Sequence, residues 1–177
     1  GDPDRSSQVG QLGSKCDEQV GRTPCNFRRI VYFRRRMNAT TERPLLLLRQ
    51  DTYVTVTADK EDKLIRLRWS GYAPSTEFRS ILGDARMNVG LHGLERWLAD
   101  LRGMNAILPH DEQWTVNEWF PSLAKSGLKR MAILMSSDYF NQMSVDRIMQ
   151  AATPEMPFAV AYFDDEDSAL AWLLASD

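Results

Sequence analysis

The chain has 177 residues, of which 43% are hydrophobic and 26% are charged, and its formal net charge is −2. These values are typical of one globular domain with its own core, and no apolar run approaches the roughly 20 residues of a membrane-spanning helix. Residues 1–36 hold 8 Lys and Arg against 4 Asp and Glu, whereas residues 37–177 hold 14 against 20. A mildly acidic globular part lacks the basic footprint of a nucleic-acid binder. We therefore expect neither a nucleic-acid partner nor a transmembrane segment.

Residues 1–44 are expected to lie outside the folded domain, which we place at residues 45–177. The leader begins as a polar, Gly- and Ser-rich stretch without periodicity, which predicts disorder. The basic segment FRRIVYFRRRM is then either an anchor for an anionic surface or part of a leader that is not native, because residue 1 is not Met and Met37 precedes the first strand. Both cysteines, Cys16 and Cys25, lie in this leader. The domain therefore has no disulfide framework, and we expect a cytoplasmic location.

The domain opens with a predicted β-hairpin. Tyr53–Ala58 (YVTVTA) alternates β-branched and aromatic residues, and Leu64–Trp69 (LIRLRW) is its partner across a charged turn. Ser75 is the expected N-cap of the first helix, and Gly90 and Gly93 flank its end. The apolar stripe of this helix has helical spacing and consists of Phe78, Ile81, Leu82, Ala85 and Val89.

A strand is predicted at Arg96–Leu101, and a second helix is predicted from Pro109, a residue suited to a first helical turn. Pro121 removes the backbone bond to Asn117 and predicts a kink or break, and Gly127 is the expected stop. The inward face of this helix is predicted to carry Val116, Trp119, Phe120, Leu123 and Ala124.

The apolar run Lys129–Met135 predicts a strand covered on both faces. A third helix with a stripe of Val145, Ile148, Met149 and Ala152 follows, and then a last strand at Phe158–Phe163. Asp164 or Asp165 caps the fourth helix, which carries inward-facing Ala169, Leu170, Leu173 and Leu174. This order predicts a single α/β domain: a hairpin, then alternating strands and helices in a mostly parallel sheet.

His110 and Asp111 stand at the start of the second helix, beyond the strand that holds Asp100. A His–Asp pair near a strand end suggests acid–base chemistry in a small hydrolase or transferase. Acidic residues in a first helical turn also favour the helix dipole without any catalysis. No Gly-x-Ser-x-Gly motif accompanies the pair, and with only two histidines in the chain we expect no His-based metal site.

Polar and aromatic residues near the strand ends form a second candidate site. Asp100 and Arg102 either make a polar floor for a ligand or satisfy the backbone of the following loop. Trp114, and Tyr139 with its neighbours Phe140 and Met143 in an expected loop, either line an apolar cleft for a small hydrophobic ligand or pack as local core. An exposed aromatic patch would instead suit a docking protein.

Five segments carry a family resemblance: EFRSIL, RWLADLRGM, NEWFPSLAKSGLKRMAILMS, MSVDRIM and YFDDEDSALAWLL. They span roughly residues 50–175 and resemble the SpoIIAA-like branch of the STAS superfamily. The resemblance implies a four- to five-stranded sheet with helices mainly on one face. Relatives include bacterial antagonists of anti-sigma factors, switched by phosphorylation of a Ser or Thr, and the fold is related to CRAL-TRIO-type lipid-binding domains. The stretch Leu101–Trp114 contains no Ser or Thr, so no phospho-acceptor is carried over.

The expected function is that of a non-enzymatic, bacterial STAS-type regulatory or binding module that uses no cofactor or metal. Its partner would be a regulatory protein or a small apolar ligand, and a homodimer is compatible with the sequence. The alternative is the hydrolase or transferase built on His110 and Asp111. The working surface of the binding module is predicted to consist of Asp100, Arg102, Met104, His110, Trp114 and Tyr139.

Overall fold

The structure is a computed structural model that describes residues 32–33, 44–152 and 156–176. The predicted disorder, anchor and non-native origin of the leader concern residues that lie, apart from Tyr32 and Phe33, outside this described part.

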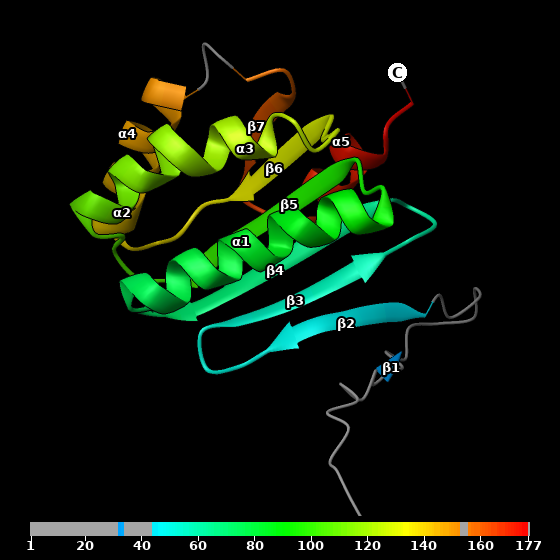
Figure 1. Cartoon of the computed structure of the whole chain (residues 1–177), viewed down its shortest axis with the longest axis horizontal. Coiled ribbons are helices and arrows are strands. Elements are labelled where there is room, and N and C mark those ends of the chain that lie inside the picture. The colour runs from blue at the N-terminus through cyan, green and yellow to red at the C-terminus, as the bar shows by residue number, and fades with distance from the viewer. Residues whose placement is uncertain (1–31, 34–43, 153–155, 177) are drawn as a thin grey trace, which may run out of the picture.

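One sheet organises the described chain, and its strands follow one another in sequence order from β1 to β7 (Figure 1). The strands are β1 Tyr32–Phe33, β2 Leu45–Gln50, β3 Val54–Asp59, β4 Leu64–Gly71, β5 Arg96–Met104, β6 Arg130–Leu134 and β7 Ala159–Phe163. The first four strands pair antiparallel, and β4 to β7 pair parallel. The helices are α1 Ser75–His92, α2 Pro109–Trp114, the π-helical turn η1 Thr115–Trp119, α3 Phe120–Leu123, α4 Tyr139–Ala152 and α5 Glu166–Leu174.

The α/β class and the opening β3–β4 hairpin are confirmed, but the predicted sheet is too small and too parallel. Three of its pairings are antiparallel because β1 and β2 extend it beyond the hairpin. The sequence did not reveal β2, since LLLLRQ lacks the alternation of a half-buried strand. A register shift between Leu47 and Arg49 lets Leu48 pack on the core while Arg49 reaches α1. The sheet is therefore mixed.

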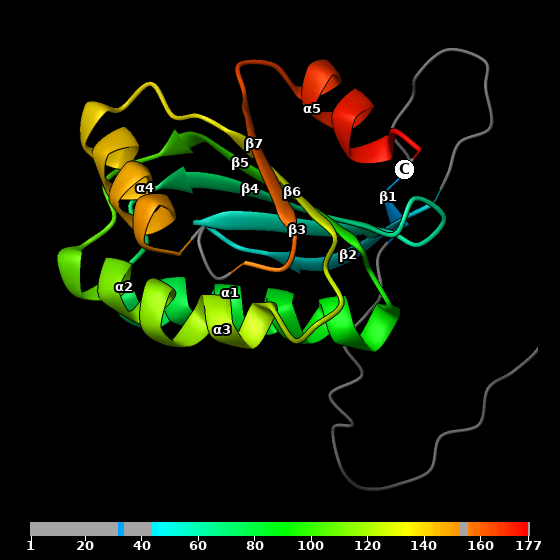
Figure 2. The ribbon, with the colours of Figure 1, turned by 90° about the horizontal axis from the view of Figure 1, so that it is seen from above.

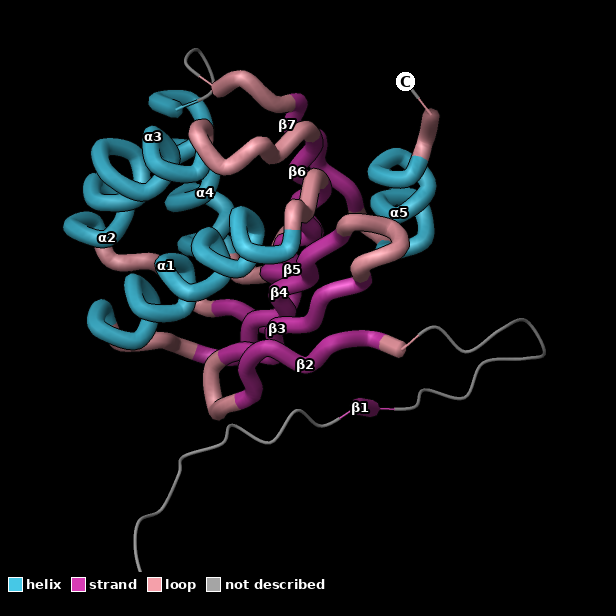
Figure 3. Tube along the Cα trace, turned by 45° about the vertical axis from the view of Figure 1, so that its right-hand side comes forward, coloured by secondary structure: helices cyan, strands magenta, loops and turns pink. Residues whose placement is uncertain are grey.

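Three crossovers place α1, the α2–α3 segment and α4 on the same face of the sheet. Each crossover joins neighbouring parallel strands and moves in one direction, from β4 towards β7, and right-handed connections then all pass over one face. Figures 2 and 3 show these helices on one side and α5 on the other. The prediction of helices mainly on one face agrees with this arrangement.

The main core lies between the sheet and these helices. The five predicted residues of the α1 stripe are all buried, as are the four of α4. Trp97 on β5 is 1% exposed and packs edge-on against Trp119, with ring centroids 5.4 Å apart. The Nε1 of Trp119 donates to the carbonyl of Leu82 at 2.9 Å, so the α2–α3 segment is tied to α1.

The helix ends differ in part from the predictions. Ser75 was expected to cap α1, but it is the first helical residue and Pro74 holds the N-cap position. Gly93 ends α1 in the left-handed conformation with φ 59°, as expected. Pro121 was expected to kink or break the helix. The backbone is not broken there, but the π-helical turn η1 directly precedes the short α3 that contains Pro121, so the α-helical hydrogen-bond pattern is interrupted. That helix ends at Leu123, however, and not at Gly127.

A smaller core lies on the opposite face, under α5. It joins Leu64, Leu98, Ala132 and Leu134 of the sheet with Ala169 and Leu173 of the helix. Asp165 caps α5 by accepting from the backbone of Ser168 at 2.8 Å. At the other end, Arg96 donates to the carbonyl of Leu173 at 2.7 Å, and Arg130 donates to that of Trp172 at 2.9 Å. Arginines thus satisfy the last carbonyls of α5.

A bulge at the end of β5 keeps both Leu101 and Met104 in the main core, although they are three residues apart. The register passes from Arg68 opposite Asp100 to Ser70 opposite Gly103, which shifts the alternation by one residue. A Cβ on Gly103 would lie 2.8 Å from the carbonyl oxygen of Trp69. A glycine is therefore required where the two backbones approach.

We predict that Gly103→Ala lowers the free energy of unfolding by about 1–3 kcal/mol, the usual range for forced overpacking. Gly83→Ala is the matched control, because its Cβ meets nothing within 4 Å in the middle of α1. This control should gain about 0.4–1 kcal/mol. Urea unfolding followed by tryptophan fluorescence measures both. Equal stability of Gly103→Ala and the unmutated protein would contradict the close approach.

Candidate functional site

Two neighbouring rows of side chains cross the strands on the face of the sheet under α5. One row runs through the paired residues Leu47, Thr57, Arg66 and Leu98. The next row runs through Gln50, Thr55, Arg68, Asp100 and Leu134. Each row is apolar where α5 covers it and polar in the middle.

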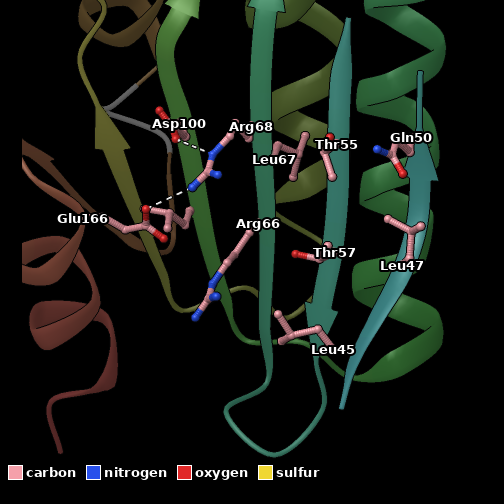
Figure 4. Close-up of a pocket in the computed structure, with 11 residues that line it drawn as sticks. Leu45, Leu47, Gln50, Thr55, Thr57, Arg66, Leu67, Arg68, Asp100 and Glu166 are labelled. Atoms are coloured by element: carbon pink, nitrogen blue, oxygen red, sulfur yellow. Dashed lines mark hydrogen bonds and ion pairs between the residues drawn. The ribbon is translucent and has the colours of Figure 1, made fainter. Parts of the chain in front are cut away.

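Beside α5 this face is hollowed into a cavity of about 400 Å³, which is within the usual size range of small-molecule sites. Figure 4 shows Arg66 and Arg68 projecting from β4 into it, with the leucines of β2 on one side and Glu166 of α5 on the other. The lining consists of Leu45, Leu47, Gln50, Thr55, Thr57, Arg66, Leu67, Arg68, Leu98, Asp100 and Glu166. It is an amphipathic pocket with an apolar wall on β2.

Four charged side chains form a closed network at one end of this cavity. Arg68 donates from Nε to Asp100 at 3.0 Å and from Nη2 to Glu166 at 3.0 Å. Arg102 donates to both carboxylate oxygens of Asp100, at 2.9 and 2.8 Å. The two arginines thus balance the two acids, and the network ties the first turn of α5 to β4 and β5.

Asp100 is the buried centre of this network, with 7% of its side chain exposed. Burial by itself would raise the pKa of this carboxyl, but hydrogen bonds from Arg102 and Arg68 outweigh it and hold the pKa below 3.8. The same contact raises the pKa of Arg102. Asp100 is therefore a fixed anion, which suits a positioning role and not proton transfer.

A second, more open hollow of about 470 Å³ continues from the first. The two share Thr55, Arg68 and Asp100, and the second adds Arg102 and Gly103. Asp100 and Arg102, predicted as a polar floor, therefore both border a hollow. Asp100 also accepts from the backbone of Arg102 at 3.2 Å, so it has the loop role as well.

The other four predicted site residues lie elsewhere. Met104 is buried in the main core, and its carbonyl accepts from Ser136 at 2.9 Å. Trp114 packs on the edge of that core with its ring 6.4 Å from Phe78 and 5.2 Å from the guanidinium of Arg79. These contacts correspond to the alternative in which Trp114 is local core.

Tyr139 and Phe140 are in the first turn of α4 and not in a loop as expected. They are 65% and 67% exposed, with ring centroids 6.0 Å apart, and Met143 beside them is 39% exposed. They form a small aromatic patch at the end of the sheet. In the described part of the chain, no hydrogen bond or ion pair joins this patch to Asp100.

His110 and Asp111 meet Ser75, the first residue of α1. The Oγ of Ser75 lies 2.6 Å from Nε2 of His110 and donates to Oδ2 of Asp111 at 2.6 Å. Arg79 holds the other oxygen of Asp111 at 2.8 Å. In a Ser-His-Asp triad the acid binds the second nitrogen of the imidazole, whereas here Asp111 binds the serine directly. The arrangement ties α2 to α1.

Four parts of the cavity were not predicted from the sequence: Arg66, Arg68, Glu166 and the leucines of β2. The pattern LIRLRW contained a signal for the arginines, because period-two alternation places both opposite the core residues Ile65, Leu67 and Trp69. Glu166 lies 98 residues from Arg68 in the chain. Only the tertiary structure brings it to the cavity.

In three comparisons with known proteins, the chain matches no family model, no curated protein and no solved structure. Within the described residues, no group of three or more His, Cys, Asp or Glu side chains is placed to hold a metal ion. None of the described helices has the length and apolar character needed to cross a membrane.

We predict that Asp100→Asn lowers the free energy of unfolding by about 1–3 kcal/mol at neutral pH, the cost of losing charge-assisted hydrogen bonds. The depressed pKa means that the ionised form stabilises the folded state. That contribution is complete above pH 3.8 and is lost as the pH falls through the folded pKa.

The difference between the unmutated protein and Asp100→Asn should therefore shrink below pH 3.8 in urea titrations at several pH values. Glu118→Gln, at an exposed position, is the control and should change little. A difference that stays constant far below this pH would show that the ionisation of Asp100 does not support the fold.

Proposed function

We propose that this protein is a non-enzymatic binding module that holds a small, partly apolar ligand in the cavity beside α5. The observation that carries the proposal is the cavity of about 400 Å³, with leucines along one wall and arginines across its floor. Cavities of this size that combine an apolar wall with a few directed polar groups are the usual form of small-molecule sites.

The rigidity of the cavity floor supports this function. Its polar end is fixed by the Arg68–Asp100–Arg102–Glu166 network, and its base is a pair of central strands. Side chains held by neighbours bind with little loss of conformational entropy. The proposed site therefore lies on the face of the sheet and not at the strand ends. It retains Asp100 and Arg102 of the six predicted residues and excludes Met104, His110, Trp114 and Tyr139.

The STAS-type assignment is part of this proposal. Support comes from the five resembling segments and from the placement of three crossover helices on one face. A cytoplasmic location is likewise proposed, on the composition of the chain alone. A regulatory protein partner is the competing binding role, and the exposed patch of Tyr139, Phe140 and Met143 is the observation that favours it.

We predict that the full chain binds N-phenyl-1-naphthylamine, a neutral apolar fluorophore, saturably and with one site. Thr57→Tyr should weaken this binding at least tenfold, because the tyrosine ring would enter the cavity from β3. Tyrosine is also favoured in strands, so the substitution should leave β3 intact. Thr76→Tyr, exposed on α1 across the sheet, is the control and should bind normally.

Equal binding by Thr57→Tyr would place the fluorophore outside the cavity and contradict the proposal. Native mass spectrometry of the chain purified from its own host is the complementary measurement. An added mass that is lost on denaturation is expected in the unmutated protein and is expected to disappear in Thr57→Tyr.

A hydrolase or transferase is the second candidate, and the 2.6 Å contact between Ser75 Oγ and His110 Nε2 favours it. Asp111 competes for the same hydroxyl, so the serine proton has an acceptor other than the imidazole. We therefore predict that hydrolysis of 4-nitrophenyl acetate is the same in the unmutated protein, Ser75→Ala and Ser122→Ala. A rate that falls only in Ser75→Ala, and falls again in His110→Ala, would favour the enzyme.

A further inference from the structure

Arg66 is the charged residue of the cavity that the network leaves out. It stands in β4 between Thr57 of β3 and Leu98 of β5, in the row next to that of Arg68 and Asp100. Its Nε is buried and has no hydrogen-bond partner. The two terminal nitrogens of its guanidinium also make no hydrogen bond or ion pair with a described residue.

This isolation is unusual because the neighbouring charges are all matched. Arg68 and Arg102 are paired with Asp100 and Glu166, which leaves Arg66 as the cavity arginine without a counter-charge among the described residues. A buried donor without a partner is costly, and native proteins generally satisfy such groups. Arginine cannot escape the cost by losing its proton. An anion from outside the chain would supply the missing partner and the counter-charge together.

The surroundings of Arg66 indicate the chemistry of the ligand beyond its anionic group. Across the cavity the wall is formed by Leu45 and Leu47 of β2, and Thr57 and Thr55 add hydroxyl groups between. A ligand that fills the space has its negative group at Arg66 and its apolar part along β2. The planar guanidinium is suited to bidentate binding of a carboxylate or a phosphate.

We propose that the ligand is a small anionic amphiphile, whose carboxylate or phosphate group binds Arg66 and whose hydrocarbon part packs on Leu45 and Leu47. This inference rests on the proposed function, because it names the chemistry of the ligand in the same cavity. Arg66 supplies selectivity for the charged head, and the leucine wall supplies contact area.

The test compares decanoate with 1-decanol as displacers of N-phenyl-1-naphthylamine from the full chain. The two probes have the same hydrocarbon length and differ in the charge of the head group. Decanoate should displace the fluorophore from the unmutated protein at a concentration at least tenfold lower than decanol requires. Decyl phosphate distinguishes the two anions, and a preference for it over decanoate points to a phosphate head.

Arg66→Gln should abolish the preference for decanoate and leave displacement by decanol unchanged. Arg66→Lys, which keeps the charge but not the planar fork, should keep part of the preference. Arg86→Gln makes the same change of net charge on α1, across the sheet, and should keep all of it. An undiminished preference in Arg66→Gln would overturn the inference.

The two proposals fail in different ways. If the fluorophore binds in the cavity but decanoate and decanol compete equally in the unmutated protein, the ligand is not chosen by charge and only this inference falls. If Thr57→Tyr leaves fluorophore binding intact, the proposed function falls with it.

A melting experiment gives an independent test that needs no fluorophore. Because the Nε of Arg66 has no partner among the described residues, Arg66→Met should melt at or above the temperature of the unmutated chain. Decanoate should raise the melting temperature of the unmutated chain and not that of the variant. A lower melting temperature for Arg66→Met without ligand would show that the guanidinium supports the fold, and would overturn the inference.

Discussion

The constant hand of the crossovers is the constraint on which the rest of the structure depends. Since β4 to β7 are parallel neighbours in chain order, each connecting helix lands on the same face of the sheet. That face is closed by three helical segments and holds the main core. The opposite face is left to α5, a helix of 9 residues, which is too short to cover the first strands. The cavity exists because this second face is only half covered.

The half-covered face explains the choice of side chains on β4. Its core side carries Ile65, Leu67 and Trp69, and its other side carries Arg66 and Arg68. The long aliphatic stems of arginine can lie on an apolar sheet while the charged ends meet acids or water. For Arg68 the acids are present, from β5 and from α5. The same arrangement that anchors α5 therefore leaves Arg66 lining the cavity, where it can meet a ligand.

Local patterns in the sequence were sufficient for most elements of the domain. The hairpin, the apolar stripes of α1 and α4, the cap of α5 by Asp165 and the irregular helix before Pro121 follow from periodicity and backbone chemistry. The predictions that were wrong also concern local features of the chain. LLLLRQ has no alternation of polar and apolar residues, so β2 was not predicted. Ser75 was predicted to cap α1, but it is the first helical residue and its hydroxyl contacts α2.

The site was only partly accessible to such reasoning. Asp100 and Arg102 are two residues apart, so their pairing could be expected from their neighbourhood in the chain. The cavity joins residues from β2 to α5, and its rows are set by strand register and by two bulges. By itself the sequence determined the α/β class, the order of elements and the side of β4 on which the arginines lie, because these depend on nearest neighbours in the chain. Only the tertiary structure decided that α5 turns back over the sheet and that Arg66 faces the cavity without a counter-charge from the described part of the chain, because both depend on contacts between distant residues.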